Sequence, residues 1–135
     1  MTPHRPEPDS RCGLTLDAGA LIAAERGGSR IRRLATRAHD DGRPLTVSAA
    51  VVAQVWRDPR GGLLSAFLAA CVVEPVDLVQ ARRAGELQAR CGTDDTIDAL
   101  VAVGAAARGD VVVTSDPGDL LVLADDLGGL RILAI

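Results

Sequence analysis

Three aspartates stand where a folded chain of alternating strands and helices gathers its ligands. Asp17 follows the short apolar run of residues 14–16, and Asp116 follows the β-branched run of residues 111–114. Asp98 lies in the apolar stretch that leads into the second of these runs. In a parallel sheet the carboxyl ends of the strands form one edge, where ligands bind. We therefore expect the three carboxylates to converge at that edge.

An all-carboxylate site favours a hard divalent cation. Mg²⁺ and Mn²⁺ bind carboxylate oxygens, keep some of their waters and need neither histidine nor cysteine. The chain has no G-x-S-x-G sequence, and its two histidines, His4 and His39, have no partner pattern for acid–base catalysis. Metal-assisted hydrolysis of a phosphodiester suits such a site, because a bound metal lowers the pKa of a water and stabilises the leaving oxygen.

Each aspartate also has a purely structural interpretation. Asp17 and Asp116 are candidate N-caps, since aspartate commonly begins a helix. Asp98 is expected more than a turn inside a helix over residues 94–107, with Thr93 as the cap. A carboxylate in that apolar stretch needs a partner, because burying it alone is costly. An arginine or backbone donors would serve as well as a cation, so both interpretations stay open for each residue.

The composition excludes several classes of protein. All 15 basic residues are arginine. P-loop enzymes and Schiff-base enzymes depend on a lysine, as do response-regulator receivers and haloacid-dehalogenase-type phosphatases. Three cysteines without C-x-x-C spacing argue for a reducing cytoplasm and against a zinc knuckle. The formal charge of −3 gives no nucleic-acid signature by itself.

The chain is predicted to form one α/β domain over residues 13–135, preceded by a flexible, proline-rich tail over residues 1–12. At 135 residues it is long enough for a substantial core, and no apolar run reaches the length of a membrane span. The alternation of elements predicts a parallel sheet with helices on both faces. Strands are expected at residues 14–16, 45–47, 72–76, 111–114 and 130–135, and helices at 18–25, 29–41, 49–58, 61–70, 78–91, 94–107 and 120–127.

Several other polar residues are candidates for contacts with a ligand. Arg30, Arg33 and Arg37 share one face of a helix, which is either a solvated face or a contact for a phosphate backbone. Arg57 flanks the end of the helix over residues 49–58. Gln54 lies among apolar neighbours on that helix and is either a buried, hydrogen-bonded amide or part of a site.

Four stretches together resemble the motif blocks of PIN-domain proteins. They are LDAGALI at residues 16–22, VAQVWR at 52–57, TIDALVA at 96–102 and TSDPGDL at 114–120. Their order and spacing are most similar to actinobacterial toxins of VapBC-type toxin–antitoxin pairs, and the resemblance covers roughly residues 14–135. It implies a PIN-like three-layer fold whose central parallel sheet of four to five strands has the order 3-2-1-4-5.

The resemblance also implies an activity and a set of site residues. The activity is cleavage of single-stranded RNA with Mg²⁺ or Mn²⁺, by a cytoplasmic homodimer that a cognate antitoxin binds. Asp17, Asp98 and Asp116 would be the catalytic metal-site carboxylates, and Asp119 would be an accessory ligand. Gln54, Asp95 and Ser115 would lie near the site. For an RNA substrate, the helix-face arginines Arg30, Arg33 and Arg37 and the flanking Arg57 are the candidate contacts.

The second motif block departs from the family, because Gln54 stands where a glutamate is usual. An amide can coordinate a metal or hold a water but carries no charge. The alternative to a ribonuclease is therefore a PIN-like module that binds RNA or an antitoxin and cleaves weakly or not at all. A phosphotransfer domain such as a receiver fits less well, since lysine and a second acid beside Asp17 are absent.

Overall fold

The computed structural model describes residues 12–135 and contains one parallel sheet of five strands. Its strand order, β3-β2-β1-β4-β5, confirms the predicted α/β class and the order that the resemblance implied. The succession of strands and helices along the chain is also as predicted. The elements are β1 (Leu14–Leu16), α1 (Ala18–Glu25), α2 (Ser29–Asp40), β2 (Leu45–Ser48), α3 (Ala49–Val55), α4 (Gly62–Ala69), β3 (Val72–Glu74), α5 (Leu78–Cys91), α6 (Thr96–Arg108), β4 (Val111–Thr114), α7 (Gly118–Asp126) and β5 (Arg131–Ala134).

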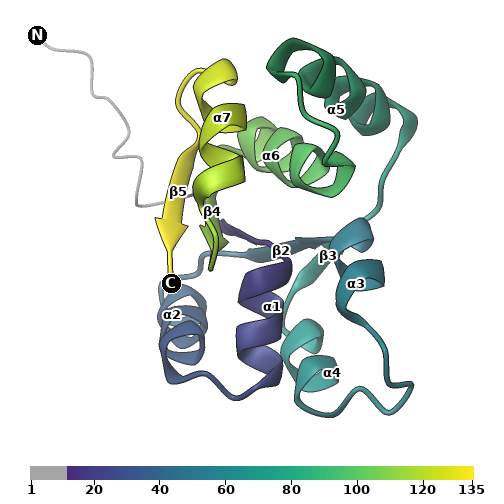
Figure 1. The fold of residues 1–135 in the computed structure, drawn as a ribbon. Helices are drawn as coiled ribbons and strands as arrows, with labels where there is room; N and C mark the ends of the chain where they lie inside the picture. Colours follow the sequence, from purple (N-terminus) through teal and green to yellow (C-terminus); the bar gives the residue numbers. More distant parts are fainter. Residues whose placement is uncertain (1–11) are drawn as a thin grey trace, which may run out of the picture.

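Helices cover both faces of the sheet (Figure 1). Helices α1, α2 and α4 lie below the strands in this view, whereas α5, α6 and α7 lie above them. The strands β1 and β4 occupy the middle of the sheet, and both are in contact with α1 on one side and α6 on the other. A loop that follows either strand therefore emerges between two helical layers, which is where a site can be enclosed.

Helix α6 is the buried helix that its sequence predicts. Every residue from 99 to 105 is buried, as expected for a helix that is apolar on all sides. Gly104 leaves room for the ion pair of Glu74 and Arg108, because a Cβ there would lie 2.8 Å from Oε1 of Glu74. The helix packs against β1, β2 and β4 as well as α5 and α7. Side chains at its N-terminus are thereby held firmly at the edge of the sheet.

The start of α6 differs from the prediction. The helix begins at Thr96 and not at residue 94, and its N-cap is Asp95 and not Thr93. A carboxylate oxygen of Asp95 accepts from the backbone N–H of Asp98 at 3.0 Å, while Thr93 Oγ1 accepts from the N–H of Asp95 at 3.3 Å. The prediction that Asp98 lies more than a turn inside the helix was wrong. It lies in the first turn, where the helix dipole favours a negative charge.

Other helix boundaries also shift, most of all those of α7 and α3. Helix α7 begins at Gly118 with Pro117 as its N-cap, so the structural interpretation of Asp116 as that cap was wrong. Helix α3 ends at Val55, because the backbone of Trp56 is extended (φ −67°, ψ 121°), three residues before the predicted end. The predicted bounds of α1 and α5 are confirmed.

Residues 1–11, which hold most of the predicted tail, lie outside the described residues, and Cys12 accepts a hydrogen bond from Arg131. Among residues 12–135, every helix is too short or too polar to cross a membrane.

Candidate metal centre

Asp17 lies at the end of β1, the middle strand of the sheet. Its side chain is 8% exposed, and its Oδ1 accepts from the backbone N–H of Ala20 at 3.0 Å, which makes it the N-cap of α1. The capping interpretation of this residue is therefore confirmed, and it does not exclude a role in the site. Burial raises the pKa of Asp17, and the negative charge of Asp116 adds to that rise. Hydrogen bonds from Thr114, Ala20 and Gly19 oppose it.

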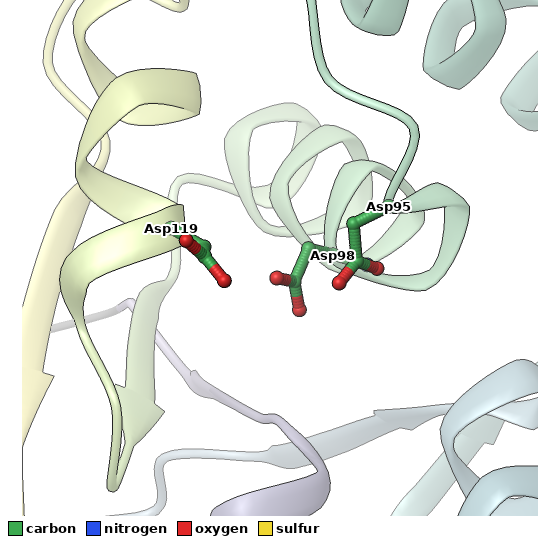
Figure 2. A group of neighbouring side chains, drawn as sticks. All are labelled: Asp95, Asp98 and Asp119. Atoms are coloured by element: carbon green, nitrogen blue, oxygen red, sulfur yellow. The ribbon is translucent and has the colours of Figure 1, made fainter.

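Three other carboxylates meet beside this edge (Figure 2). Asp95 and Asp98 come from the beginning of α6, and Asp119 comes from the first turn of α7. The side chains of Asp98 and Asp119 point toward one another across the gap between the two helices. One carboxylate oxygen from each of the three residues lies within 4.8 Å of the others. Two helix N-termini thus place acids from distant parts of the sequence together.

Asp98 is the most strongly perturbed acid of the group. Its pKa is raised from 3.8 to about 7, first by burial and then by the charge of Asp95. A hydrogen bond between the carboxyls of Asp98 and Asp95 contributes in the same direction, as do the charges of Asp17 and Asp119. No ion pair within residues 12–135 involves Asp98, so the interpretation that an arginine neutralises it fails there. The fold brings like charges together without a protein cation between them.

The donor set fits a small divalent cation. Oxygens on opposite sides of Mg²⁺ are about 4 Å apart, since each Mg–O bond is about 2.0–2.1 Å. The 4.8 Å spread of the three carboxylate oxygens is close to that span. Carboxylates alone, with neither thiolate nor imidazole, suit Mg²⁺ or Mn²⁺ better than a soft metal. Asp95, Asp98 and Asp119 are therefore the residues that could hold such an ion.

The predicted catalytic residues fall into two connected parts of this edge. Asp17 acts electrostatically on Asp98, and Asp116 acts on Asp17. The hydroxyl of Thr114 links Asp17 and Asp116. It is hydrogen-bonded to Asp17 and accepts from the backbone N–H of Asp116 at 3.0 Å. Asp116 is exposed and lies in the loop between β4 and α7. The compact group of three oxygens, however, contains Asp98 and Asp119 but neither Asp17 nor Asp116.

Residue Gly19 determines how closely the β4–α7 loop approaches α1. A Cβ at this position would lie 2.0 Å from Oγ of Ser115. The small residue that follows Asp17 thus makes room for the loop that carries Ser115 and Asp116. Ser115 is thereby placed beside the start of α1, near the edge where the carboxylates lie.

The remaining predicted residues lie on other elements. Gln54 is exposed on α3, so the interpretation of this amide as a buried core group was wrong. The guanidinium of Arg57 donates to the carbonyls of Ala53 and Trp56, at 3.0 and 2.8 Å, and thus satisfies the end of α3. The arginines of α2 line a separate groove, which is described below.

Asp95 has a larger place in the site than the sequence suggested. It was expected near the site, but its carboxylate is one of the three that lie together. The spacing of Asp95 and Asp98 could have indicated this role. An acid three residues before another acid, at the start of a helix, caps that helix and also lies beside the second acid.

Comparison with known proteins identifies the fold. No model of a protein family matches the sequence, and no curated protein matches it. Solved structures do match the chain. One is VapBC2 from Rickettsia felis, bound to a DNA fragment from the VapBC2 promoter. It aligns with a TM-score of 0.72 at 15% identity, over 90% of this chain and 98% of that one. DNA-bound VapBC from Salmonella typhimurium aligns with a TM-score of 0.69 at 20% identity, over 91% and 98% of the two chains.

A third structure, PAE2754 from Pyrobaculum aerophilum, aligns with a TM-score of 0.61 at 18% identity, over 90% of this chain and 91% of that one. The chain therefore has the PIN-like α/β fold that the resemblance of its motif blocks implied. At these identities the likeness extends to the fold, and the chemistry has to be argued from this chain's own residues.

Proposed function

We propose that this protein is a metal-dependent endoribonuclease that cleaves single-stranded RNA, and that it is the toxin of a toxin–antitoxin pair. The observation that carries the proposal is the group of Asp95, Asp98 and Asp119 at the edge where Asp17 ends the middle strand. A VapC-type fold with carboxylates at this edge is what the four motif blocks imply. The divalent cation is Mg²⁺ or Mn²⁺.

The site residues divide into ligands and supporting groups. Asp98 and Asp119 would hold the cation together with Asp95, while Asp17 and Asp116 would complete the acidic edge as ligands directly or through water. A bound cation lowers the pKa of a water and stabilises the charge on the leaving oxygen. The cation would also favour the ionised form of Asp98. An adjacent positive charge stabilises a carboxylate, whereas burial and the neighbouring acids of the fold destabilise it. Thr114 orients Asp17 by its hydrogen bond.

The proposal is tested by incubating the full chain with an end-labelled, unstructured RNA in Mn²⁺, in Mg²⁺ and in EDTA. We expect cleavage with either metal, none in EDTA, and none by Asp98→Asn or Asp119→Asn. Asp94→Asn is the matched control, since Asp94 is an exposed neighbour outside the group of three. Cleavage that persists in EDTA, or in both site variants, would rule the mechanism out.

A module that binds RNA or an antitoxin without efficient cleavage is the second candidate. The observation that favours it is Gln54, a neutral residue at the position where the resemblance implies an acid, exposed on α3. RNA binding without cleavage at any Mn²⁺ concentration, combined with cleavage by Gln54→Glu, would select this candidate.

The proposed partners follow from the VapC-type fold and the resemblance. A cognate antitoxin would bind this chain, and the chain would itself form a homodimer. Co-expression with the product of a small neighbouring gene tests the first proposal, and light scattering of the purified protein tests the second. A protein that is monomeric at all concentrations would refute the dimer.

A further inference from the structure

A groove of about 620 Å³ runs between α2 and the edge strand β5. One wall consists of Arg30, Arg33 and Arg37, the three arginines that share a helix face, with Arg32 beside them. The other wall is the apolar end of the chain, residues 133–135. Within residues 12–135, β5 is an edge strand with no partner on its outer side, and its last residues line the groove.

The groove concentrates positive charge on a chain that is acidic as a whole. Four of its lining residues are arginines and only one, Asp40, is an acid, although the formal charge of the chain is −3. Among residues 12–135, the ion pairs of arginine involve Arg90 and Arg108 and none of these four. Their guanidiniums therefore have no carboxylate partner in the described part of the chain. Such a surface attracts an anionic ligand.

Two hydrogen bonds connect the groove with the carboxyl ends of β5 and β4. The guanidinium of Arg30 donates to the carbonyl of Ala134 at 3.4 Å, at the carboxyl end of β5. The backbone N–H of Ile135, which lines the groove, donates to the carbonyl of Thr114 at 2.9 Å. Thr114 directly precedes Ser115 and Asp116 and is hydrogen-bonded to Asp17. The groove is therefore linked to the strand end from which the loop with Ser115 and Asp116 begins.

We propose that this groove binds the backbone of the single-stranded RNA on one side of the cleavage site, a role that rests on the proposed ribonuclease function. Arg30 and Arg37 are seven residues apart, or about 10 Å of helix, which is long enough to contact more than one phosphate of an RNA strand. The chain has a single tryptophan and a single phenylalanine, Trp56 and Phe67, and neither lines the groove. Binding is therefore electrostatic and tolerant of sequence.

RNA fits the groove better than an acidic protein segment for two reasons. The groove is hydrogen-bonded to the end of β4, where the loop with Asp116 begins, and an RNA whose scissile phosphate is held by a cation at the acidic edge would have its neighbouring phosphates available to the arginines. The open edge of β5 also offers backbone donors and acceptors to ribose 2′-hydroxyls, and arginine planes can stack on unpaired bases.

The experiment is a fluorescence-anisotropy titration of a fluorescein-labelled uridine 12-mer with the full chain in EDTA, at several KCl concentrations. Arg33→Gln/Arg37→Gln removes two charges from the groove. Arg82→Gln/Arg83→Gln removes two exposed charges from α5 as the matched control. We expect the groove pair to weaken binding at least tenfold and to lower the salt slope by about 1.4, since each phosphate contact on a single strand contributes about 0.7. The control pair should retain the wild-type affinity.

The outcomes separate this inference from the proposed function. The titration is done in EDTA, where no cleavage is expected, so RNA affinity is measured independently of cleavage. Equal RNA affinity of the wild type and the groove variant would overturn the inference even if the enzyme cleaves, and so would an equal loss in the control pair. An oligoglutamate 12-mer that binds the wild type as tightly as RNA does would overturn it in favour of an acidic protein partner.

Discussion

Replacing Asp98 by asparagine should make the metal-free protein more stable while it abolishes cleavage. The pKa of Asp98 is raised from 3.8 to about 7 by burial and by neighbouring acids. The ionised side chain therefore opposes folding above pH 7, and asparagine keeps the shape without the charge. Its amide can also donate to Asp95, as the protonated carboxyl does.

The magnitude follows from the difference between the folded and unfolded pKa. Each unit corresponds to about 1.4 kcal/mol, so the full difference would be about 4 kcal/mol. Asp98 is half-buried and solvent screens part of this energy, which leaves on the order of 1–2 kcal/mol. For a domain of this size that is a rise in Tm of about 4–8 °C.

The sign of the pH dependence is a second test of the same reasoning. A carboxyl whose pKa is raised on folding binds its proton more tightly in the folded state, so unfolding releases protons between pH 4 and 7. The stability of the wild type in EDTA should fall as pH rises through this window, and the fall should be smaller in Asp98→Asn. The assay is thermal unfolding in EDTA from pH 4 to 8, with Asp94→Asn as the control. A variant less stable than the wild type at pH 8 would show that Asp98 is a stabilising structural group.

Three other experiments test the position of residue 54, the binding of Mn²⁺ and the packing of α6. Gln54→Glu should tighten Mn²⁺ binding in calorimetric titration, raise cleavage and lower the Tm in EDTA; equal affinity and Tm would show that residue 54 faces away from the acids. Saturating Mn²⁺ should stabilise the wild type by about 2.7 kcal/mol at a concentration 100 times the Kd, and this gain should be lost in Asp98→Asn. Gly104→Ala should lower the free energy of unfolding by about 1 kcal/mol or less, because its Cβ would meet the paired ends of the Glu74 and Arg108 side chains and displace them. Gly85→Ala on α5, where a Cβ meets nothing within 4 Å, should instead stabilise slightly, and an equal response of the two glycines would refute the packing argument.

Periodicity and strand composition were enough to predict the architecture. The β-branched run of residues 111–114 and the helix between Asp77 and Gly92 carry strong local signals, and both have the predicted bounds. The start of α6 was not predictable in the same way, because Thr93, Asp94 and Asp95 are all good caps and tertiary packing selects among them. Asp95 was selected, which placed Asp98 in the first turn.

For the same reason, the sequence alone did not predict which acids form the group of three. Sequence placed Asp17 and Asp116 after strands and Asp98 on the buried helix. The meeting of Asp119 with Asp95 and Asp98 depends on how α7 begins relative to α6. That helix starts at Gly118, so Asp119 lies in its first turn and faces the neighbouring helix. A shift of one residue changes the direction of a helical side chain by about 100°, and boundary errors of this size decide which acids meet.

The carboxylates at the two ends of α6 differ in whether the protein supplies a cation to neutralise them. At the C-terminal end, Asp110 is 4% exposed and accepts from Gly13 N, Thr15 Oγ1 and Arg108 Nε at 3.1, 2.8 and 2.9 Å. Arg108 also pairs with Glu74, so each acid has a cation. At the N-terminal end, Asp98 faces Asp95 and Asp119 with no arginine among residues 12–135 to neutralise them. The acids at the C-terminal end of α6 are thus fully paired, whereas those at the N-terminal end repel one another, and a divalent cation at that end would remove the repulsion.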